Sequence, residues 1–187
     1  QYKLHEEEFT MSHDIYLKDP VTKKVAKVLG HLMIGGTYKA DYHPETGTFT
    51  PAMNTEAWLN ITYNYSRYYY ECYEEGIEKI YGMSGIESIP VLEEMISVLM
   101  NNYQNDGVWM KSKRSKKIYL DEYGNEIDYL AIITGKQKSY REEIVEYEVD
   151  EGDTENYWTP TAANAIRPLH KLIALAKMRP DCIWDGD

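Results

Sequence analysis

The sequence is poor in cysteine, in positive charge and in long apolar runs. Two cysteines in 187 residues do not make a disulfide framework, so we expect a chain that folds in a reducing compartment. No apolar run approaches the ~18 residues of a membrane-spanning helix. Residues 1–10 lack the basic and apolar regions of a signal peptide, and we expect them to form an N-terminal extension. These absences predict a cytoplasmic protein with no membrane partner.

Basic residues are outnumbered by acidic ones. The sequence has 20 Lys and Arg residues and 31 Asp and Glu residues, which give a formal net charge of −11. A field of this sign repels nucleic acid, so we expect no direct nucleic-acid binding. The sequence also lacks a Gly-rich phosphate loop, a Cys-x-x-Cys pair and a His-Glu-x-x-His motif. We therefore expect no cofactor and no metal. The missing catalytic motifs favour a non-enzymatic protein without deciding the matter.

Tyrosine is abundant, with 18 residues against 2 phenylalanines. A tyrosine ring contributes apolar surface, and its hydroxyl needs a partner when it is buried. Tyrosine is also a favoured residue of binding surfaces. Two interpretations follow: a tyrosine-rich core with satisfied hydroxyls, or a tyrosine-lined ligand cleft or partner surface.

Local patterns predict an α+β fold in which residues 11–187 form one domain. A small antiparallel sheet from residues 14–63 is expected to pack on three or four helices. The sheet should include a hairpin at 14–29, with a turn at 19–22, and a strand at 58–63. Helices are predicted at 67–81, 88–101 and 161–178. Gly76 should end the first helix, with a further helical turn at 77–81, and apolar residues recur at helical spacing in the other two.

Residues suited to helix ends support these predictions. Ser66, Ser88 and either Thr159 or Thr161 are the expected N-terminal caps. Pro168 removes a backbone donor within the last predicted helix, so we expect a kink or a break there.

Residues 108–150 differ from the rest and are predicted to be a charged insertion rich in β-hairpins. A basic cluster spans 111–117, a hairpin is expected at 118–130, and an acidic strand follows. The basic and acidic sides can face each other. Alternatively, the acidic side contacts a partner through Glu142, Glu143, Glu146, Glu148, Asp150 and Glu151.

The densest polar and aromatic cluster gives a candidate ligand site. Asn60, Thr62 and Asn64 would share one face of a strand, where two amides and a hydroxyl can bind a planar polar ligand. Aromatic rings would stack on the ligand, and further polar groups would meet an amide or a phosphate. These residues are Tyr63, Tyr65, Tyr81, Trp158, Asn164, Arg167 and Arg179. The alternatives are structural: the amides stabilise the strand-to-helix turn, and Arg179 pairs with Asp181.

One further pattern is carried by residues 11–22, 35–38, 57–65, 76–77, 80–82, 85, 87–92, 157–161, 164–165, 176–181 and 184–187. These segments resemble a family of small proteins encoded by tailed phages, prophages and bacteria, and the resemblance covers most of residues 11–105 and 156–187. Residues 108–150 depart from the family pattern. The family has no assigned activity to transfer, so the resemblance implies only a phage or mobile-element origin and a bacterial cytoplasm.

Three functional hypotheses follow. The first is a non-enzymatic, phage-type accessory protein that counters host defence by binding a small nucleotide-like ligand or a host protein through the Asn/Tyr cluster. The second is an acidic decoy that mimics nucleic acid and blocks a host protein. The third is a hydrolase that uses Asp14, His31 or Asp185. A homo-oligomer is compatible with each of them.

Overall fold

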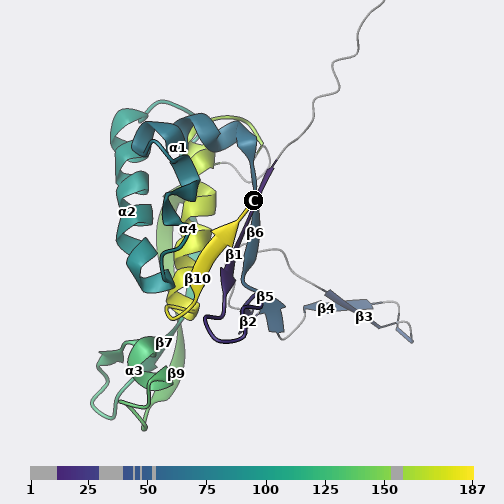
Figure 1. Cartoon of the computed structure of the whole chain (residues 1–187), viewed down its shortest axis with the longest axis vertical. Helices are drawn as coiled ribbons and strands as arrows, with labels where there is room; N and C mark the ends of the chain where they lie inside the picture. The colour runs from purple at the N-terminus through teal and green to yellow at the C-terminus, as the bar shows by residue number, and fades with distance from the viewer. Residues whose placement is uncertain (1–11, 30–39, 44, 47, 52–53, 153–157) are drawn as a thin grey trace, which may run out of the picture.

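Three antiparallel strands form the central sheet of the computed structural model (Figure 1). Their order is β10 (Ile183–Gly186), β1 (Ser12–Lys18) and β6 (Trp58–Thr62). Residues alternate along β1, so that His13, Ile15 and Leu17 are buried and their neighbours face outward. The structure describes residues 12–29, 40–43, 45–46, 48–51, 54–152 and 158–187. The expected extension at 1–10 lies outside these residues.

Helices cover the inner face of this sheet, which confirms the predicted α+β fold (Figure 1). They are α1 (Ser66–Cys72), α2 (Gly85–Asn102) and α4 (Ala162–Met178), with short 3-10 turns η2 (Tyr63–Tyr65) and η3 (Gly76–Ile80). Trp184 of β10 is 1% exposed, and its indole Nε1 donates to Ser88 Oγ at 2.7 Å. Among the described residues, no helix combines the length and apolar character needed to cross a bilayer.

The start of α2 differs from the prediction. Ser84 is the N-terminal cap, and its side chain and that of Glu87 form a reciprocal capping box. The predicted cap Ser88 is wrong, because this residue lies inside the first turn and donates its hydroxyl to the carbonyl of Gly85 at 2.7 Å. The buried hydroxyl of Ser88 therefore makes hydrogen bonds both as a donor, to this carbonyl, and as an acceptor, from the Trp184 indole.

The other helix ends were predicted with mixed success. The break expected near Gly76 within 67–81 is present, since α1 ends at Cys72, earlier than predicted, and a 3-10 turn begins at Gly76, which has φ +59°. Ser66 is the first residue of α1 and not its cap. Thr161 caps α4 as expected. Of the two alternatives expected at Pro168, a kink or a break, the break is wrong, because α4 continues through Pro168 as one helix.

Strand pairing is less local than predicted. The expected hairpin at 14–29 reduces to one bridge between Lys18 and Val25, and β2 (Lys27–Leu29) pairs instead with β5 (Asn54–Glu56). A further ribbon joins β3 (Ala40–His43) to β4 (Thr48–Pro51). Strand β10, which is not among the predicted strands, pairs with β1.

We call residues 108–151 the arm and the other described residues the body. The arm contains β7 (Met110–Leu120), β8 (Glu126–Ile127), α3 (Tyr129–Ile133) and β9 (Arg141–Glu151), with strand order β8-β7-β9. It extends beyond the helices, as the green elements of Figure 1 show. The hairpin and the acidic strand predicted within this segment are present.

Candidate functional site

The predicted Asn/Tyr cluster lies where β6 leaves the central sheet. Asn60 and Thr62 belong to the outward face of this strand. The amide Nδ2 of Asn60 donates to Ser12 Oγ and to Asp14 Oδ1, both at 2.7 Å. This amide therefore links β6 to β1.

Asn64 does not share the strand face, which corrects the predicted geometry. The strand ends at Thr62, whose hydroxyl caps the following turn by accepting from the Asn64 backbone N–H at 3.3 Å. The Asn64 amide donates to the carbonyl of Trp158 at 2.9 Å. Both contacts stabilise the strand-to-helix turn and the chain beside it, as the structural alternative predicts.

The aromatic residues of the cluster are also separated. Tyr63 packs edge-on against His13, with ring centroids 4.2 Å apart, and Tyr65 is 3% exposed in the core. Tyr81 lies beside β10, where its hydroxyl is 3.5 Å from the carbonyl of Asp187. Burial, followed by the charge of Glu78, raises the pKa of Tyr81 well above its usual value.

The predicted C-terminal residues serve the ends of α4. Asn164 is 3% exposed and donates to the carbonyl of Thr159 at 3.1 Å, so it holds the chain that enters the helix. Arg167 is half-buried on the same helix. The ten predicted ligand residues are therefore spread over the sheet edge, the core and both ends of α4. They do not line one site.

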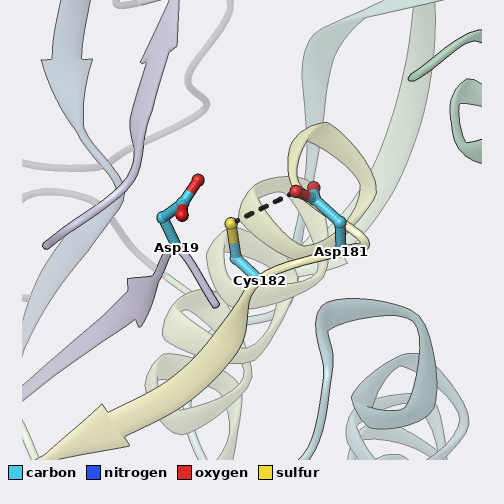
Figure 2. Close-up of side chains that lie close together, drawn as sticks. All are labelled: Asp19, Asp181 and Cys182. Carbon is cyan, nitrogen blue, oxygen red and sulfur yellow. Dashed lines mark hydrogen bonds between the residues drawn. The ribbon is translucent and has the colours of Figure 1, made fainter. Parts of the chain in front are cut away.

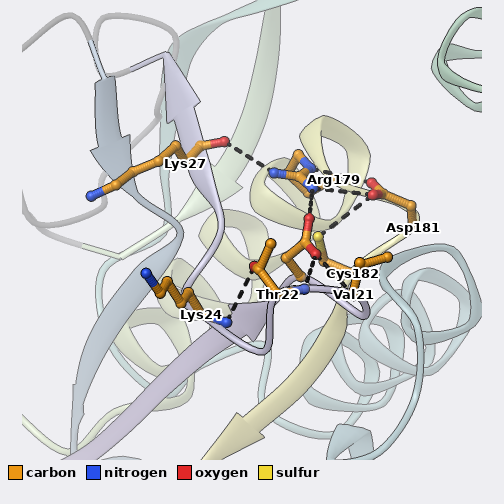
Figure 3. A network of polar contacts seen from close by, with 8 residues as sticks. Val21, Thr22, Lys24, Lys27, Arg179, Asp181 and Cys182 are labelled. Carbon is orange, nitrogen blue, oxygen red and sulfur yellow. Dashed lines mark hydrogen bonds and ion pairs between the residues drawn. The ribbon is translucent and has the colours of Figure 1, made fainter.

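Arg179 is the centre of a polar network at the C-terminal end of α4 (Figure 3). Its guanidinium forms a two-pronged ion pair with Asp181 at 3.1 and 3.2 Å, which confirms the predicted pair. It also donates to Asp19 at 3.2 Å and to the Lys27 carbonyl at 3.4 Å. The hydrogen bonds to Asp181 raise the pKa of Arg179 further above its usual value. This network joins α4, β2 and the turn after β1.

The same network brings together three groups that could ligate a metal. Oxygen atoms of Asp19 and Asp181 and the Cys182 sulfur lie within 4.8 Å of one another (Figure 2). The Arg179 guanidinium already neutralises both carboxylates. Burial raises the pKa of the Cys182 thiol to about 12, so a metal would have to displace the thiol proton at neutral pH. The donor set suits an arginine-centred ion pair better than a cation.

The predicted acidic partner face is part of the β7–β9 ladder. Lys111 pairs with Asp150 at 3.1 Å, and Lys117 pairs with Glu142 at 2.5 Å. Glu148 lies opposite Lys113 in the register, and Glu146 lies opposite Ser115. Glu143 is exposed, and the backbone of Glu151 pairs with that of Met110. The basic and acidic sides thus face each other, one of the two alternatives raised by the sequence.

A cavity of about 810 Å³ lies between the arm and the body, and it was not predicted. We call it the arm–body cavity. Its body wall comes from α2 and α4, with an apolar surface that includes Ile86, Ile89 and Ile173. Its arm wall comes from β7, β8, β9 and α3. Among the ten predicted ligand residues, Arg179 lines it.

Aromatic side chains of the arm form much of the opposite wall. Tyr119 and Tyr129 stack with ring centroids 5.2 Å apart, and both line the cavity together with Tyr147. Burial raises the pKa of Tyr119 to about 12, so its hydroxyl stays protonated at neutral pH and can donate a hydrogen bond.

Charged groups lie among these apolar surfaces. Glu93 of α2 and Lys177 of α4 both line the cavity. Neither side chain makes a hydrogen bond or an ion pair within the described part of the chain. In contrast, Lys116 pairs with Glu126 at 3.5 Å. Lys27 and Arg179 also line the cavity but are held in ion pairs, so Glu93 and Lys177 are the charges of the body wall left for a molecule in the cavity.

One signal in the sequence could have indicated this site. Helix α2 has a core stripe of Leu92, Met95 and Leu99, all 0% exposed. It has a second apolar stripe at Ile86, Ile89 and Ile96, which lines the cavity. Apolar residues on two faces of a helix predict two covered surfaces, but the sequence does not say that the arm covers the second.

Comparisons with known proteins return no match to this chain among protein-family models, curated proteins or solved structures. The resemblance to a phage-encoded family therefore stays a prediction. The functional argument rests on the geometry of the arm–body cavity.

Proposed function

We propose that this protein binds a small amphipathic molecule in the arm–body cavity. The observation that carries the proposal is the cavity itself, with a volume of about 810 Å³. Ligand sites for small molecules occupy ~300–1,000 Å³ and combine apolar walls with a few polar groups. A nucleotide-like molecule, with a planar ring and polar substituents, is one class that fits this description.

The chemistry of the two walls supports this class of ligand. An apolar or aromatic body would lie between the isoleucines of α2 and the tyrosines of the arm. Its polar groups would meet Glu93 and Lys177, whose charges have no partner in the described part of the chain. Such an arrangement favours a ligand with both apolar and polar parts over a purely charged one.

Binding is better supported than catalysis. Cys182 and Tyr119 both have a pKa of about 12, which keeps a nucleophile or base in its protonated form at neutral pH. Asp14 and Asp185, proposed above as hydrolytic residues, bond to Asn60 and Lys18 respectively. The third, His31, lies outside the described residues.

The phage-type origin suggested by the sequence favours a role for this binding in countering a host defence. A protein that counters a host defence would bind a small molecule of the host and withdraw it from its receptor. Mass spectrometry of small molecules released from protein purified from bacterial cells would identify such a ligand. A decoy role has less support, because the acidic strand of the arm faces lysines within the ladder.

The first test uses N-phenyl-1-naphthylamine, a neutral dye whose fluorescence rises in apolar surroundings. We expect saturable binding to the wild-type protein. Ala174 lines the cavity, so Ala174→Trp should fill it and weaken dye binding by about tenfold or more. Glu74→Trp adds the same side chain at an exposed position of the body and should leave binding unchanged.

Two outcomes would overturn the proposal. One is no saturable dye binding to the wild-type protein, and the other is equal affinity in the wild-type protein and in Ala174→Trp. The same variants then serve in thermal unfolding with a panel of nucleotides. A ligand present at 100 times its dissociation constant stabilises by about 2.7 kcal/mol, and tenfold weaker binding in Ala174→Trp should reduce that stabilisation to about 1.4 kcal/mol or less.

A further inference from the structure

We infer that Gly107 and Gly152 are positioning residues that set the arm wall of the cavity, an inference that rests on the proposed function. One glycine precedes the arm and the other follows it. Both lie against the first turn of α4, so the two ends of the arm meet at a single joint.

Gly107 passes close to the cap of α4. A Cβ atom at this position would lie 2.7 Å from Thr161 Oγ1 and 3.0 Å from Ala163 Cβ. Its φ of +96° is a backbone conformation that a residue with a side chain rarely adopts. Glycine is therefore required here for two independent reasons, space and backbone conformation.

Gly152 is buried against the same turn. A Cβ atom here would lie 2.6 Å from the backbone carbon of Ala163 and 2.6 Å from the backbone nitrogen of Asn164, and it would overlap Asn164 Oδ1. Backbone atoms of a helix cannot move aside as a flexible side chain can. Asn164 is itself held by its hydrogen bond to the Thr159 carbonyl. Any side chain at position 152 must therefore displace the end of β9.

Asp106, the residue before Gly107, forms hydrogen bonds with the first turn of α4. Its carbonyl accepts from the backbone N–H of Ala163 at 3.2 Å, and its carboxylate accepts from that of Ala162 at 3.3 Å. The carboxylate also accepts from the hydroxyl of Tyr68. These contacts satisfy free N–H groups in the first turn of α4 and tie the start of the arm to them.

The far part of the arm reaches the opposite end of the same helix. Burial raises the pKa of Tyr129, and Arg179 lies close enough to this phenol to offset part of that rise. Helix α4 has 17 residues and is about 25 Å long. The arm therefore contacts the start of α4 at its two ends, and the arm tyrosines that line the cavity lie toward the C-terminal end of that helix. A shift at the joint moves that wall relative to α2 and α4.

The test is Gly152→Ala, assayed with N-phenyl-1-naphthylamine and by hydrogen exchange. We expect dye binding to weaken by about tenfold or more, because the arm wall moves while the body wall stays. The amides of the β7–β9 ladder should keep their protection, since the arm moves as a folded unit. Gly135→Ala is the matched control in the arm, with φ +71° and open space around its Cβ position, and it should leave dye affinity unchanged.

The outcomes separate this inference from the proposed function. If the wild-type protein binds the dye and Gly152→Ala binds it equally well, the positioning role is wrong and the cavity remains a ligand site. If Gly152→Ala loses protection throughout the ladder, the glycine is needed for folding of the arm and the positioning role is again wrong. Absence of dye binding to the wild-type protein overturns the proposed function.

Discussion

The body and the arm are stabilised by different forces. The body has an apolar core with fully buried large side chains, including Trp184, Tyr68 and Tyr69. Among the arm side chains that the structure describes, Leu120 alone is buried. The arm depends on its backbone ladder and on pairs such as Lys111–Asp150, and exposed ion pairs of this kind contribute ~0.2–1 kcal/mol each.

Their charges differ as well. The arm has eight basic and ten acidic residues, a net charge of −2, so the rest of the chain carries −9 of the total of −11. Because the arm buries so few of its described side chains, we expect it to open more easily than the body. Contacts with α2 and α4 therefore matter more to the arm than to the body, and the cavity lies where these contacts are made.

The largest expected effect is on the core of the body. Trp184→Ala should lower the free energy of unfolding by ~3–5 kcal/mol, because it leaves a cavity in the core and removes the N–H group that donates to Ser88 Oγ. Tyr123→Ala, at an arm position that is 82% exposed, should change it by less than ~0.5 kcal/mol. Urea unfolding measures both. Similar losses in the two variants would contradict the comparison.

A smaller effect is expected where α2 crosses α4. A Cβ atom at Gly85 would lie 2.6 Å from the Arg179 carbonyl and 2.9 Å from the Ala176 carbonyl, so Gly85→Ala should cost ~1–3 kcal/mol through overpacking. Gly124→Ala in the arm has open space and costs only the strain of its φ of +86°, about 1 kcal/mol. A larger loss of stability in Gly124→Ala would be evidence against a separate, weaker arm.

Reversing one charge in the β7–β9 ladder should destabilise the arm without affecting the body. Lys111→Glu places two negative charges opposite each other at Asp150, which should destabilise the arm by about 0.5–1 kcal/mol. Hydrogen exchange should detect faster opening of β7 and β9 with no change in the body helices. Lys138→Glu changes the net charge equally at an exposed arm position outside the ladder, and it should leave these rates unchanged.

The smallest effect concerns acid stability. Backbone N–H groups of Thr22 and Val21 lower the pKa of Asp19, and Arg179 adds to this. Because the folded pKa lies below the unfolded value, the contribution of Asp19 is complete above about pH 4 and is lost as the pH falls through the folded pKa. Asp19→Asn should therefore show a shallower loss of body stability in acid. An identical pH dependence in the two proteins would argue against this role.

Part of the fold could be predicted because its signals are local. Alternation along Ser12–Lys18, the apolar stripe of α2 and the Thr161 cap each act within a few residues. Strand β10 escaped prediction because Ile183–Gly186 is short and has no strand pattern of its own. Its partner, β1, lies at the other end of the described chain. Hydrogen bonding to a sheet edge, and the burial of Trp184, make it a strand.

The candidate site was predicted less well than the fold. Asn60, Thr62 and Asn64 have the residue types of a ligand site, but their hydrogen bonds go to neighbouring strands and to Trp158. Arg179 is the one predicted residue that lines the cavity, and it does so as part of an ion-pair network. The isoleucines of α2 and the tyrosines of the arm lie far apart in the sequence. Their convergence depends on where the arm lies.

The sequence by itself determined the α+β class, the main helices, the charged hairpin segment and the acidic surface. These properties follow from residue spacing, turn chemistry and composition, all of which act over short stretches of chain. Only the tertiary structure decided that the C-terminal segment completes the sheet and that the arm closes a cavity over α2 and α4. Both depend on contacts between distant segments, and side chains such as Gly152 or Ile86 acquire their roles only from the surface they meet.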